Sequence, residues 1–224
     1  MIPRTPEPEL MDEAEQARAY AEADFDEPNA AFIERVEAVL EAHPVPAEAR
    51  VVDLGCGPAD IAVRLAERHP GWRVDAIDGA AAMLAHAKRA ADAAGVGDRL
   101  RLVRGRLPEA PSEVPVGGYD LVLSNSLLHH LPEPDVLWRT IDRIARPGAP
   151  IVVMDLFRPE DEGTLDRLVE TYAADAPPVL RRDFRASLHA AFTVEEVRAQ
   201  LGACAASLEV RACSDRHLLV RGTR

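Results

Sequence analysis

The segment Val51-Val-Asp-Leu-Gly-Cys-Gly-Pro-Ala-Asp-Ile-Ala62 decides the fold of this chain. A short apolar run leads into two glycines, and a helical pattern with Ile61 and Leu65 on one side follows at once. A strand, a glycine turn and a helix in this order begin a βαβ unit. In such a unit a ligand can contact the turn backbone and the helix N-terminus at the carboxyl edge of the sheet. The segment therefore predicts an α/β domain with a ligand site at that edge.

Apolar runs on both sides extend this unit into a sheet. Five runs are predicted as strands of the parallel part, at 50–54, 72–77, 99–103, 119–124 and 150–155. Helical patterns separate most of them, at 59–69, 80–94 and 134–146. Two later runs, at 206–212 and 216–221, predict an antiparallel C-terminal hairpin. The alternation predicts a Rossmann-like α/β fold with a seven-stranded, mostly parallel sheet and helices on both faces.

Two helical additions are predicted around this sheet. Residues 1–46 contain helical patterns at 11–23 and 29–42 and are predicted to form an N-terminal helical cap or lid before a domain over 47–224. Patterns at 161–174 and 179–190 predict a helical insertion at 158–192. Thr193-Val-Glu-Glu196 then gives a capping box that begins a last helix.

Composition and charge disfavour several classes of function. The chain of 224 residues carries 26 basic and 38 acidic residues, a net charge of −12, which repels nucleic acids. It contains no apolar run of roughly 18 residues and no signal-peptide pattern, so we expect a cytoplasmic protein without a membrane partner. Cys56, Cys204 and Cys213 lack metal-ligand spacing, so no metal site is indicated. The oligomeric state is not indicated.

Two acidic residues flank the glycine turn. Asp53 precedes it, and Asp78 ends the next predicted strand. A phosphate-binding turn needs a third glycine and free N–H donors, but Ala59 stands at that position and Pro58 lacks an N–H. An acid at Asp53 favours an ammonium, and a carboxylate at Asp78 can accept two ribose hydroxyls. The pattern predicts a nucleoside that carries a cation; the alternative is that both acids cap the following helices.

Four motifs, in order along the chain, carry a family resemblance. They are Asp-Leu-Gly-Cys-Gly-Pro at 53–58, Ala-Ile-Asp at 76–78, Tyr119-Asp-Leu-Val-Leu-Ser-Asn-Ser-Leu-Leu-His-His-Leu131 and Arg146-Pro-Gly-Ala149. With them the chain resembles the class I S-adenosylmethionine-dependent methyltransferases, and is similar to the small-molecule enzymes of ubiquinone and menaquinone biosynthesis. The resemblance covers about residues 48–157. It implies S-adenosylmethionine as the cofactor and methyl transfer to a small acceptor, which could be anionic.

The resemblance also implies which residues contact the cofactor. Asp53 would lie near its ammonium and Asp78 would accept the ribose hydroxyls. Arg106 departs from the family, where an acid meets the adenine amino group, so the backbone near Leu107 would replace that contact or the alignment shifts there. The remaining implied contacts are Gly55, Cys56 and Gly57 at the amino acid part, Gly79, Met83 and Gly105 at the adenosine, and Ser124, Asn125 and Ser126 beside the methyl group.

Methyl transfer requires chiefly an aligned acceptor, because the sulfonium is already electrophilic. Asn125-Ser-Leu-Leu128 lacks the Asn-Pro-Pro-aromatic pattern of enzymes that methylate bases or glutamine amides, which argues against that class. His129 and His130 follow, and either could act as a general base, His130 being favoured. The alternative is that these histidines only pack or bond to backbone.

Acceptor contacts are predicted past the fifth strand and at the N-terminus. Asp155 and Arg158 follow that strand, and Tyr172 and Arg185 lie in the helical insertion, where arginine could bind a carboxylate or phosphate. The alternative for the insertion arginines is a solvated face paired with acids. Tyr20 lies in a segment that could close over the cofactor or pack on the sheet. The rival functions are a non-catalytic S-adenosylmethionine-fold scaffold and a protein or RNA methyltransferase.

Overall fold

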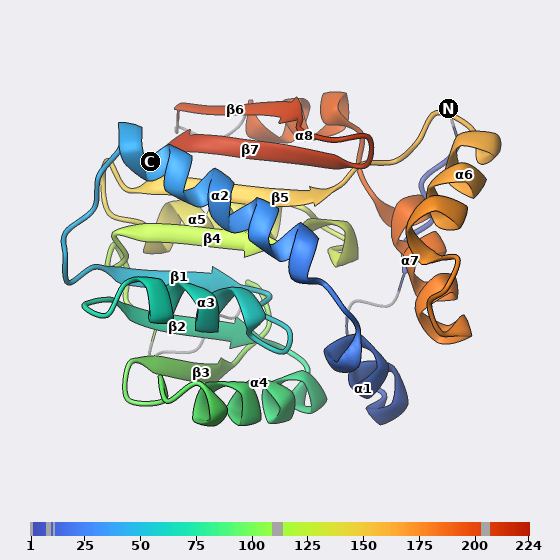
Figure 1. Cartoon of the computed structure of the whole chain (residues 1–224). Helices are drawn as coiled ribbons and strands as arrows, with labels where there is room; N and C mark the ends of the chain where they lie inside the picture. The colour runs from blue at the N-terminus through green and yellow to red at the C-terminus, as the bar shows by residue number, and fades with distance from the viewer. Residues whose placement is uncertain (1, 8–9, 11, 109–113, 203–206) are drawn as a thin grey trace.

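A computed structural model describes residues 2–7, 10, 12–108, 114–202 and 207–224 (Figure 1). One seven-stranded sheet has the order β3-β2-β1-β4-β5-β7-β6. The five strands β1 to β5 are parallel, and β7 runs antiparallel between β5 and β6. This confirms the predicted fold class. Their bounds are β1 Arg50–Leu54, β2 Arg73–Asp78, β3 Leu100–Arg104, β4 Leu121–Asn125, β5 Pro150–Leu156, β6 Ser207–Ala212 and β7 His217–Thr223.

The helices fall close to the predicted ranges. They are α1 Ala14–Glu22, α2 Asp26–Ala42, α3 Asp60–Arg68, α4 Ala81–Ala93, α5 Asp135–Ile144, α6 Glu162–Ala173, α7 Pro178–Ala190 and α8 Val194–Leu201, with a short 3₁₀ helix η1 at Leu128–His130. Residue 11, Cys204 and residue 206, which entered the sequence predictions, lie outside the described residues. Thr193 and Glu196 form the predicted capping box at the start of α8.

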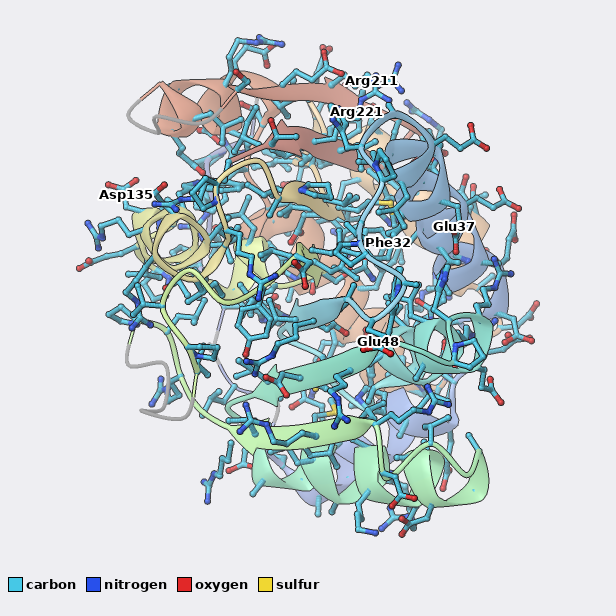
Figure 2. All side chains as sticks on the ribbon, turned by 90° about the vertical axis from the view of Figure 1, so that its left-hand side faces the viewer. Phe32, Glu37, Glu48, Asp135, Arg211 and Arg221 are labelled. Carbon is cyan, nitrogen blue, oxygen red and sulfur yellow. The ribbon has the colours of Figure 1, made fainter. Side chains whose placement is uncertain are left out.

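Alternating side chains of the strands fill two core layers. Val51 of β1 packs in the layer under α2, α3 and α4, whereas Val52 packs in the layer under α5 and α8. Figure 1 shows α2, α3 and α4 in front of the sheet. Phe32 of α2, labelled in Figure 2, is fully buried in the front layer. Truncation of such a ring to alanine costs about 3–5 kcal/mol, so α2 is a structural part of the domain.

The helices α1, α6 and α7 lie at the end of the sheet toward which β1, β4 and β5 point (Figure 1). Helix α1 contacts α4 on one side and α7 on the other, and α7 contacts η1. The segment before α1 runs along the C-terminal part of α7, where the Thr5 N–H donates to the His189 carbonyl at 3.0 Å. These elements therefore form a roof over the carboxyl edge of the sheet.

Among the residues that the structure describes, no helix combines the length and the apolar character that are needed to cross a membrane.

Candidate functional site

The glycine turn at 55–59 is held in an unusual backbone conformation. Gly55, Gly57 and Ala59 all have positive φ, at 76°, 53° and 65°. A Cβ on Gly55 would lie 2.9 Å from Leu127, whereas a Cβ on Gly57 would meet nothing within 4 Å. Gly57 therefore faces open space, while Gly55 is required by its φ and by the close approach of Leu127.

The N–H groups of this turn are already engaged. Those of Gly55 and Cys56 donate to the Ile77 carbonyl, at 2.8 and 3.0 Å, and that of Ala59 donates to the Cys56 carbonyl. The Gly57 N–H donates to a carboxylate oxygen of Asp78 at 2.8 Å. Pro58 has no N–H, so the turn offers no donor to a phosphate, in agreement with the prediction that this is not a phosphate cradle.

Asp53 and Asp78 form a buried acidic pair beside the turn. Asp53 is 2% exposed, and burial together with the charge of Asp78 raises its pKa to about 7. Among the described residues Asp53 has no hydrogen-bond or ion-pair partner. A buried carboxylate without a partner, next to the open face of Gly57, fits a cationic ligand group.

The second acid of the pair is anchored by backbone. One oxygen of Asp78 accepts from the Gly57 N–H and the other from the Ala80 N–H, both at 2.8 Å, which leaves further lone pairs for hydroxyl donors. Burial raises the pKa of Asp78, although these two hydrogen bonds act in the opposite direction. Helices α3 and α4 begin after Ala59 and Ala80 and have no side-chain cap, which disfavours the alternative of helix capping, although Asp78 accepts from the N–H of Ala80 directly before α4.

The residues implied to contact adenosine lie around Asp78 and under the N-terminal segment. A Cβ on Gly79 would lie 2.7 Å from Leu10 and 3.1 Å from Arg106. Met83 is buried between α4 and α1 with Ala17, and the Gly105 N–H donates to the Asp78 carbonyl at 3.0 Å. Arg106 is exposed and Leu107 packs on the core under α5.

The end of β4 contains one residue with a structural role, Ser124, followed by two residues with unsatisfied or strained geometry, Asn125 and Ser126. Ser124 is fully buried and its hydroxyl donates to the Leu54 carbonyl at 2.9 Å, so it bridges two strands, and we do not retain it as a cofactor contact. Ser126 has φ 57°, which is costly for a residue with a side chain. The buried Oδ1 of Asn125 has no hydrogen-bond partner among the described residues. Strain and an orphaned acceptor together indicate a functional position.

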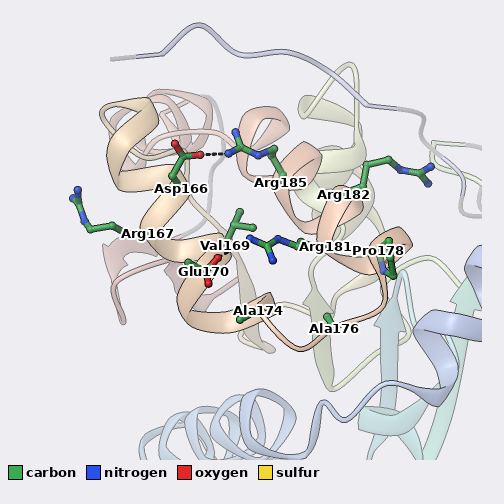
Figure 3. A pocket seen from close by; sticks show the side chains of 10 residues that line it. All are labelled: Asp166, Arg167, Val169, Glu170, Ala174, Ala176, Pro178, Arg181, Arg182 and Arg185. Carbon is green, nitrogen blue, oxygen red and sulfur yellow. Dashed lines mark hydrogen bonds and ion pairs between the residues drawn. The ribbon is translucent and has the colours of Figure 1, made fainter.

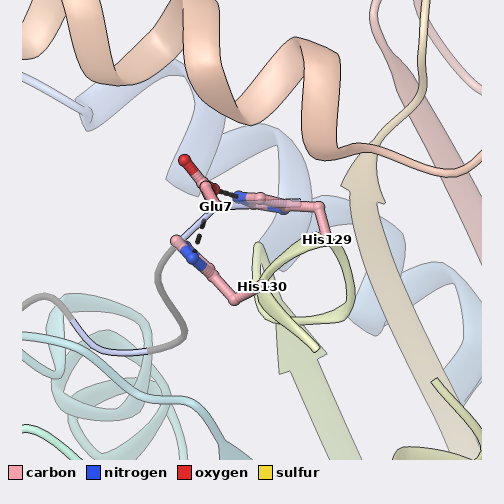
Figure 4. Close-up of side chains that lie close together, drawn as sticks. All are labelled: Glu7, His129 and His130. Carbon is pink, nitrogen blue, oxygen red and sulfur yellow. Dashed lines mark ion pairs between the residues drawn. The ribbon is translucent and has the colours of Figure 1, made fainter. Parts of the chain in front are cut away.

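His129 and His130 lie just beyond, with partners from distant parts of the chain. His129 is 3% exposed, and its Nδ1 lies 2.5 Å from Oδ1 of Asp155. Burial opposes the charged imidazole, but Asp155 and Glu7 outweigh it, so the pKa of His129 is raised. Glu7 lies between the two rings, 3.4 Å from Nε2 of His129 and 3.2 Å from Nδ1 of His130 (Figure 4).

Sequence reasoning missed Glu7. Its carboxylate accepts from the Ser187 hydroxyl of α7 at 3.0 Å, and burial raises its pKa. Glu7 precedes every predicted helix and belongs to no motif, so no local pattern could have placed it here.

Asp155 and Arg158, predicted as acceptor contacts, have protein partners instead. The Asp155 carboxylate accepts from the Leu128 N–H at 2.7 Å as well as from His129. Arg158 is 5% exposed and donates to the carbonyls of Ile2 and Ala191 and to the Glu196 carboxylate, at 3.0, 2.7 and 2.7 Å. All of this places Arg158 inside the structure, so we correct its assignment to a structural residue.

Tyr172 and Arg185 are likewise engaged away from the edge. The Tyr172 hydroxyl donates to Asp215 at 2.6 Å, and Arg216 stacks on its ring. Arg185 pairs with Asp166 of α6. It lies on the α6 side of α7, opposite the residues that face α1 and Glu7, and this supports the solvated-face alternative.

A pocket of about 920 Å³ lies between α6 and α7 (Figure 3). Three of its four lining arginines are paired with acids: Arg181 with Glu170, Arg182 with Asp183 and Arg185 with Asp166. The pocket contains none of the residues of the glycine turn or the histidine pair. We therefore treat it as separate from the candidate site.

Tyr20 of α1 lies near the carboxyl edge of the sheet. Its ring packs on Phe25 at 4.7 Å between centroids, and burial with the charges of Asp78 and Asp155 raises its pKa to about 12. Gln16 of the same helix donates to Asp183 of α7 at 2.8 Å, which ties the two parts of the roof together.

Comparisons with known proteins agree with this geometry. Residues 51–148 match the family described as a methyltransferase domain. Trans-aconitate 2-methyltransferase from Variovorax paradoxus is 35% identical over 136 residues, 60% of this chain and 48% of that protein. The tRNA 5-carboxymethoxyuridine methyltransferase from Escherichia coli is 33% identical over 111 residues, 49% of this chain and 41% of that protein. The chain thus spans less than half the length of these relatives.

A solved structure shows the same fold. The S-adenosylmethionine-dependent methyltransferase from Aquifex aeolicus superposes with a TM-score of 0.68 at 17% identity, over 94% of this chain and 98% of that one. Fold and family match define an α/β methyltransferase domain. The match over residues 51–148 and the shared fold make this chain similar to the S-adenosylmethionine-dependent methyltransferases. These matches agree with the predicted class and with S-adenosylmethionine as the predicted cofactor.

Proposed function

We propose that the protein transfers a methyl group from S-adenosylmethionine to a small molecule at the roofed carboxyl edge. The observation that carries this proposal is the roof itself: α1 joins α4 to α7, and α7 contacts η1, directly above the strand ends. Helices at this place obstruct the approach of a folded macromolecule more than that of a small acceptor. The roof also excludes water from the reacting centre when closed.

The cofactor would lie across β1, β2 and β4. Asp53 would bind the ammonium of the cofactor, and Asp78 would accept its ribose hydroxyls. Gly57 leaves space for the amino acid part of the cofactor. Gly55 and Cys56 would shape the turn beneath it. Gly79, Met83, Gly105, Arg106 and Leu107 would border the adenosine. When bound, S-adenosylmethionine would supply the electrophilic methyl group, and Asn125 and Ser126 would be the residues beside it.

His129, His130 and Glu7 would face the acceptor. His130 can take a proton from an acceptor hydroxyl, and Asp155 holds the His129 ring in place. We favour a small carboxylic acid as the acceptor, because a relative named for trans-aconitate is 35% identical. The relative named for a tRNA makes RNA the second candidate, but the net charge of −12 disfavours it.

A transfer assay with labelled S-adenosylmethionine tests this proposal. The full chain is offered trans-aconitate, a panel of other small carboxylic acids, bulk tRNA and a protein extract. We expect label in at least one small acid. Transfer to tRNA or protein alone would refute the small-molecule assignment, and cofactor binding without transfer to anything would favour the scaffold alternative.

A further inference from the structure

Glu7, His129 and His130, here called the histidine cluster, present three ligand atoms to one point. One carboxylate oxygen and two imidazole nitrogens all lie within 4.8 Å of one another. His129 is buried, and the other two residues are half-buried. Figure 4 shows the Glu7 carboxylate between the two rings, with the side chains converging from the N-terminal segment and from η1.

The distances within the cluster suit metal ligands better than hydrogen bonds. Glu7 Oε1 is 3.4 Å from His129 Nε2 and 3.2 Å from His130 Nδ1. A charge-assisted N–H···O bond would be about 2.7–2.9 Å long. Ligand atoms bound at about 2.0–2.1 Å to a tetrahedral zinc ion stand roughly 3.3–3.4 Å apart. The two separations match the edges of such a tetrahedron.

The surroundings hold each ligand in a binding orientation. His129 Nδ1 lies 2.5 Å from Asp155, so the proton of a neutral ring sits on that nitrogen and leaves Nε2, 3.4 Å from Glu7, unprotonated as a ligand atom. Asp155 is itself fixed by the Leu128 N–H at 2.7 Å. The carboxylate–histidine–metal arrangement is common in protein metal sites because it fixes the tautomer and raises the basicity of the ring.

The N-terminal segment that carries Glu7 is also anchored to the loop that carries the histidines. Arg4 donates to the carbonyls of His129 and Leu131, both at 3.1 Å, and to the Ala190 carbonyl at 2.6 Å. Ser187 donates to Glu7. The carboxylates of Glu7 and Asp155 supply two negative charges for a divalent cation beside neutral imidazoles, and Arg4 adds one positive charge nearby.

We propose that Glu7, His129 and His130 bind a divalent transition-metal ion such as zinc, with Asp155 as the residue that orients His129. Two imidazoles and one carboxylate suit zinc and its neighbours in the first transition row rather than magnesium or calcium. Three protein ligands leave a position for water or for an oxygen of the acceptor. The site stands on side-chain geometry, and in the metal-bound protein His130 is a ligand and not the general base. The use of the metal to bind an acceptor carboxylate or hydroxyl rests on the proposed function.

Metal binding to the full chain tests the site without any turnover. Protein freed of metal with a chelator is titrated with zinc by calorimetry and with cobalt(II) by visible absorption, which reports its coordination. We expect one ion per chain. Glu7→Gln and His130→Ala should each weaken binding by about 100-fold or more, and Asp155→Asn by roughly 10–100-fold. Exposed residues supply the matched controls, Glu13→Gln and His43→Ala, which should bind as the unmodified protein does.

The outcomes separate this proposal from the proposed function. Zinc should raise the melting temperature of the unmodified protein and of both controls, but not that of Glu7→Gln, which also shows whether that variant folds. No binding to the unmodified protein, or equal binding by Glu7→Gln and His130→Ala, overturns the metal site and leaves a simple charged cluster. Failure of methyl transfer to every small acid, with zinc bound as expected, overturns only the acceptor assignment.

Discussion

The two ends of the carboxyl edge are built in different ways. At the cofactor end, Asp53, the glycine turn and Asp78 come from one short stretch of chain, and backbone hydrogen bonds join them. At the acceptor end, Glu7, His129 and Asp155 come from three distant segments, and each hydrogen bond or ion pair that these residues form between the three segments involves at least one side chain. The first end is therefore fixed by local sequence and the second by tertiary packing. We expect changes at the first to act on cofactor affinity and changes at the second to act on turnover.

The largest effect is expected at the acceptor end. His130→Ala should lower kcat by roughly 10²–10⁴-fold, because the group that accepts a proton or helps to hold the acceptor is lost. Steady-state kinetics with the acceptor and calorimetry with S-adenosylmethionine measure the two parts. If His130→Ala kept a normal kcat and bound S-adenosylmethionine more weakly, the proposed difference between the two ends would be wrong.

Asp78→Ala should act in the opposite way. Loss of the carboxylate should weaken S-adenosylmethionine binding by about 1–3 kcal/mol, which is roughly 5–150-fold, because two ribose hydroxyls lose their acceptor and the Gly57 N–H loses its partner. Calorimetry measures the change, with the exposed Asp98→Ala as the control. Unchanged affinity in a folded protein would remove Asp78 from the cofactor site.

A smaller effect, several-fold, is expected from pH. The pKa of Asp53 is about 7, so its carboxylate ionises as the pH rises from 6 to 7.5, and affinity for the cationic cofactor should rise with it. Without cofactor the sign reverses for stability: the folded state holds this proton more tightly, so its contribution is lost between about pH 4 and 7. Asp53→Asn should flatten the pH dependence of binding, and a variant that keeps the full slope would show that another group titrates.

The smallest effect on activity is expected from Arg158→Lys. Lysine keeps a charge toward Glu196 but cannot make all three hydrogen bonds, so stability should fall by about 1–2 kcal/mol. The melting temperature should drop by roughly 2–8 °C while kcat and KM per folded molecule stay the same. An increased acceptor KM would return Arg158 to the acceptor site.

Much of the fold and of the cofactor end was predictable because both depend on local pattern. The strand, turn and helix around Asp53 follow from apolar periodicity and glycine placement, and Asp78 follows from its place at the end of the second strand. The acceptor end was not predictable, because it depends on contacts between distant segments and not on local pattern. Nothing near Glu7 in the sequence indicates a partner across the domain. Burial decides whether Arg158 or Ser124 faces a ligand or the interior, and single positions do not reveal burial.

Ser126 carries a consequence for anyone who wishes to make this protein more robust. Its left-handed backbone is a conformation that glycine or asparagine adopts at lower cost, so a stability screen would favour either residue there. Ser126 directly follows Asn125, and its N–H donates to the Met154 carbonyl of β5 at 2.9 Å. If Asn125 and Ser126 lie beside the transferred methyl group as proposed, a more flexible backbone at this point would misalign it. Thermal tolerance and catalytic precision are thus set against each other at one residue.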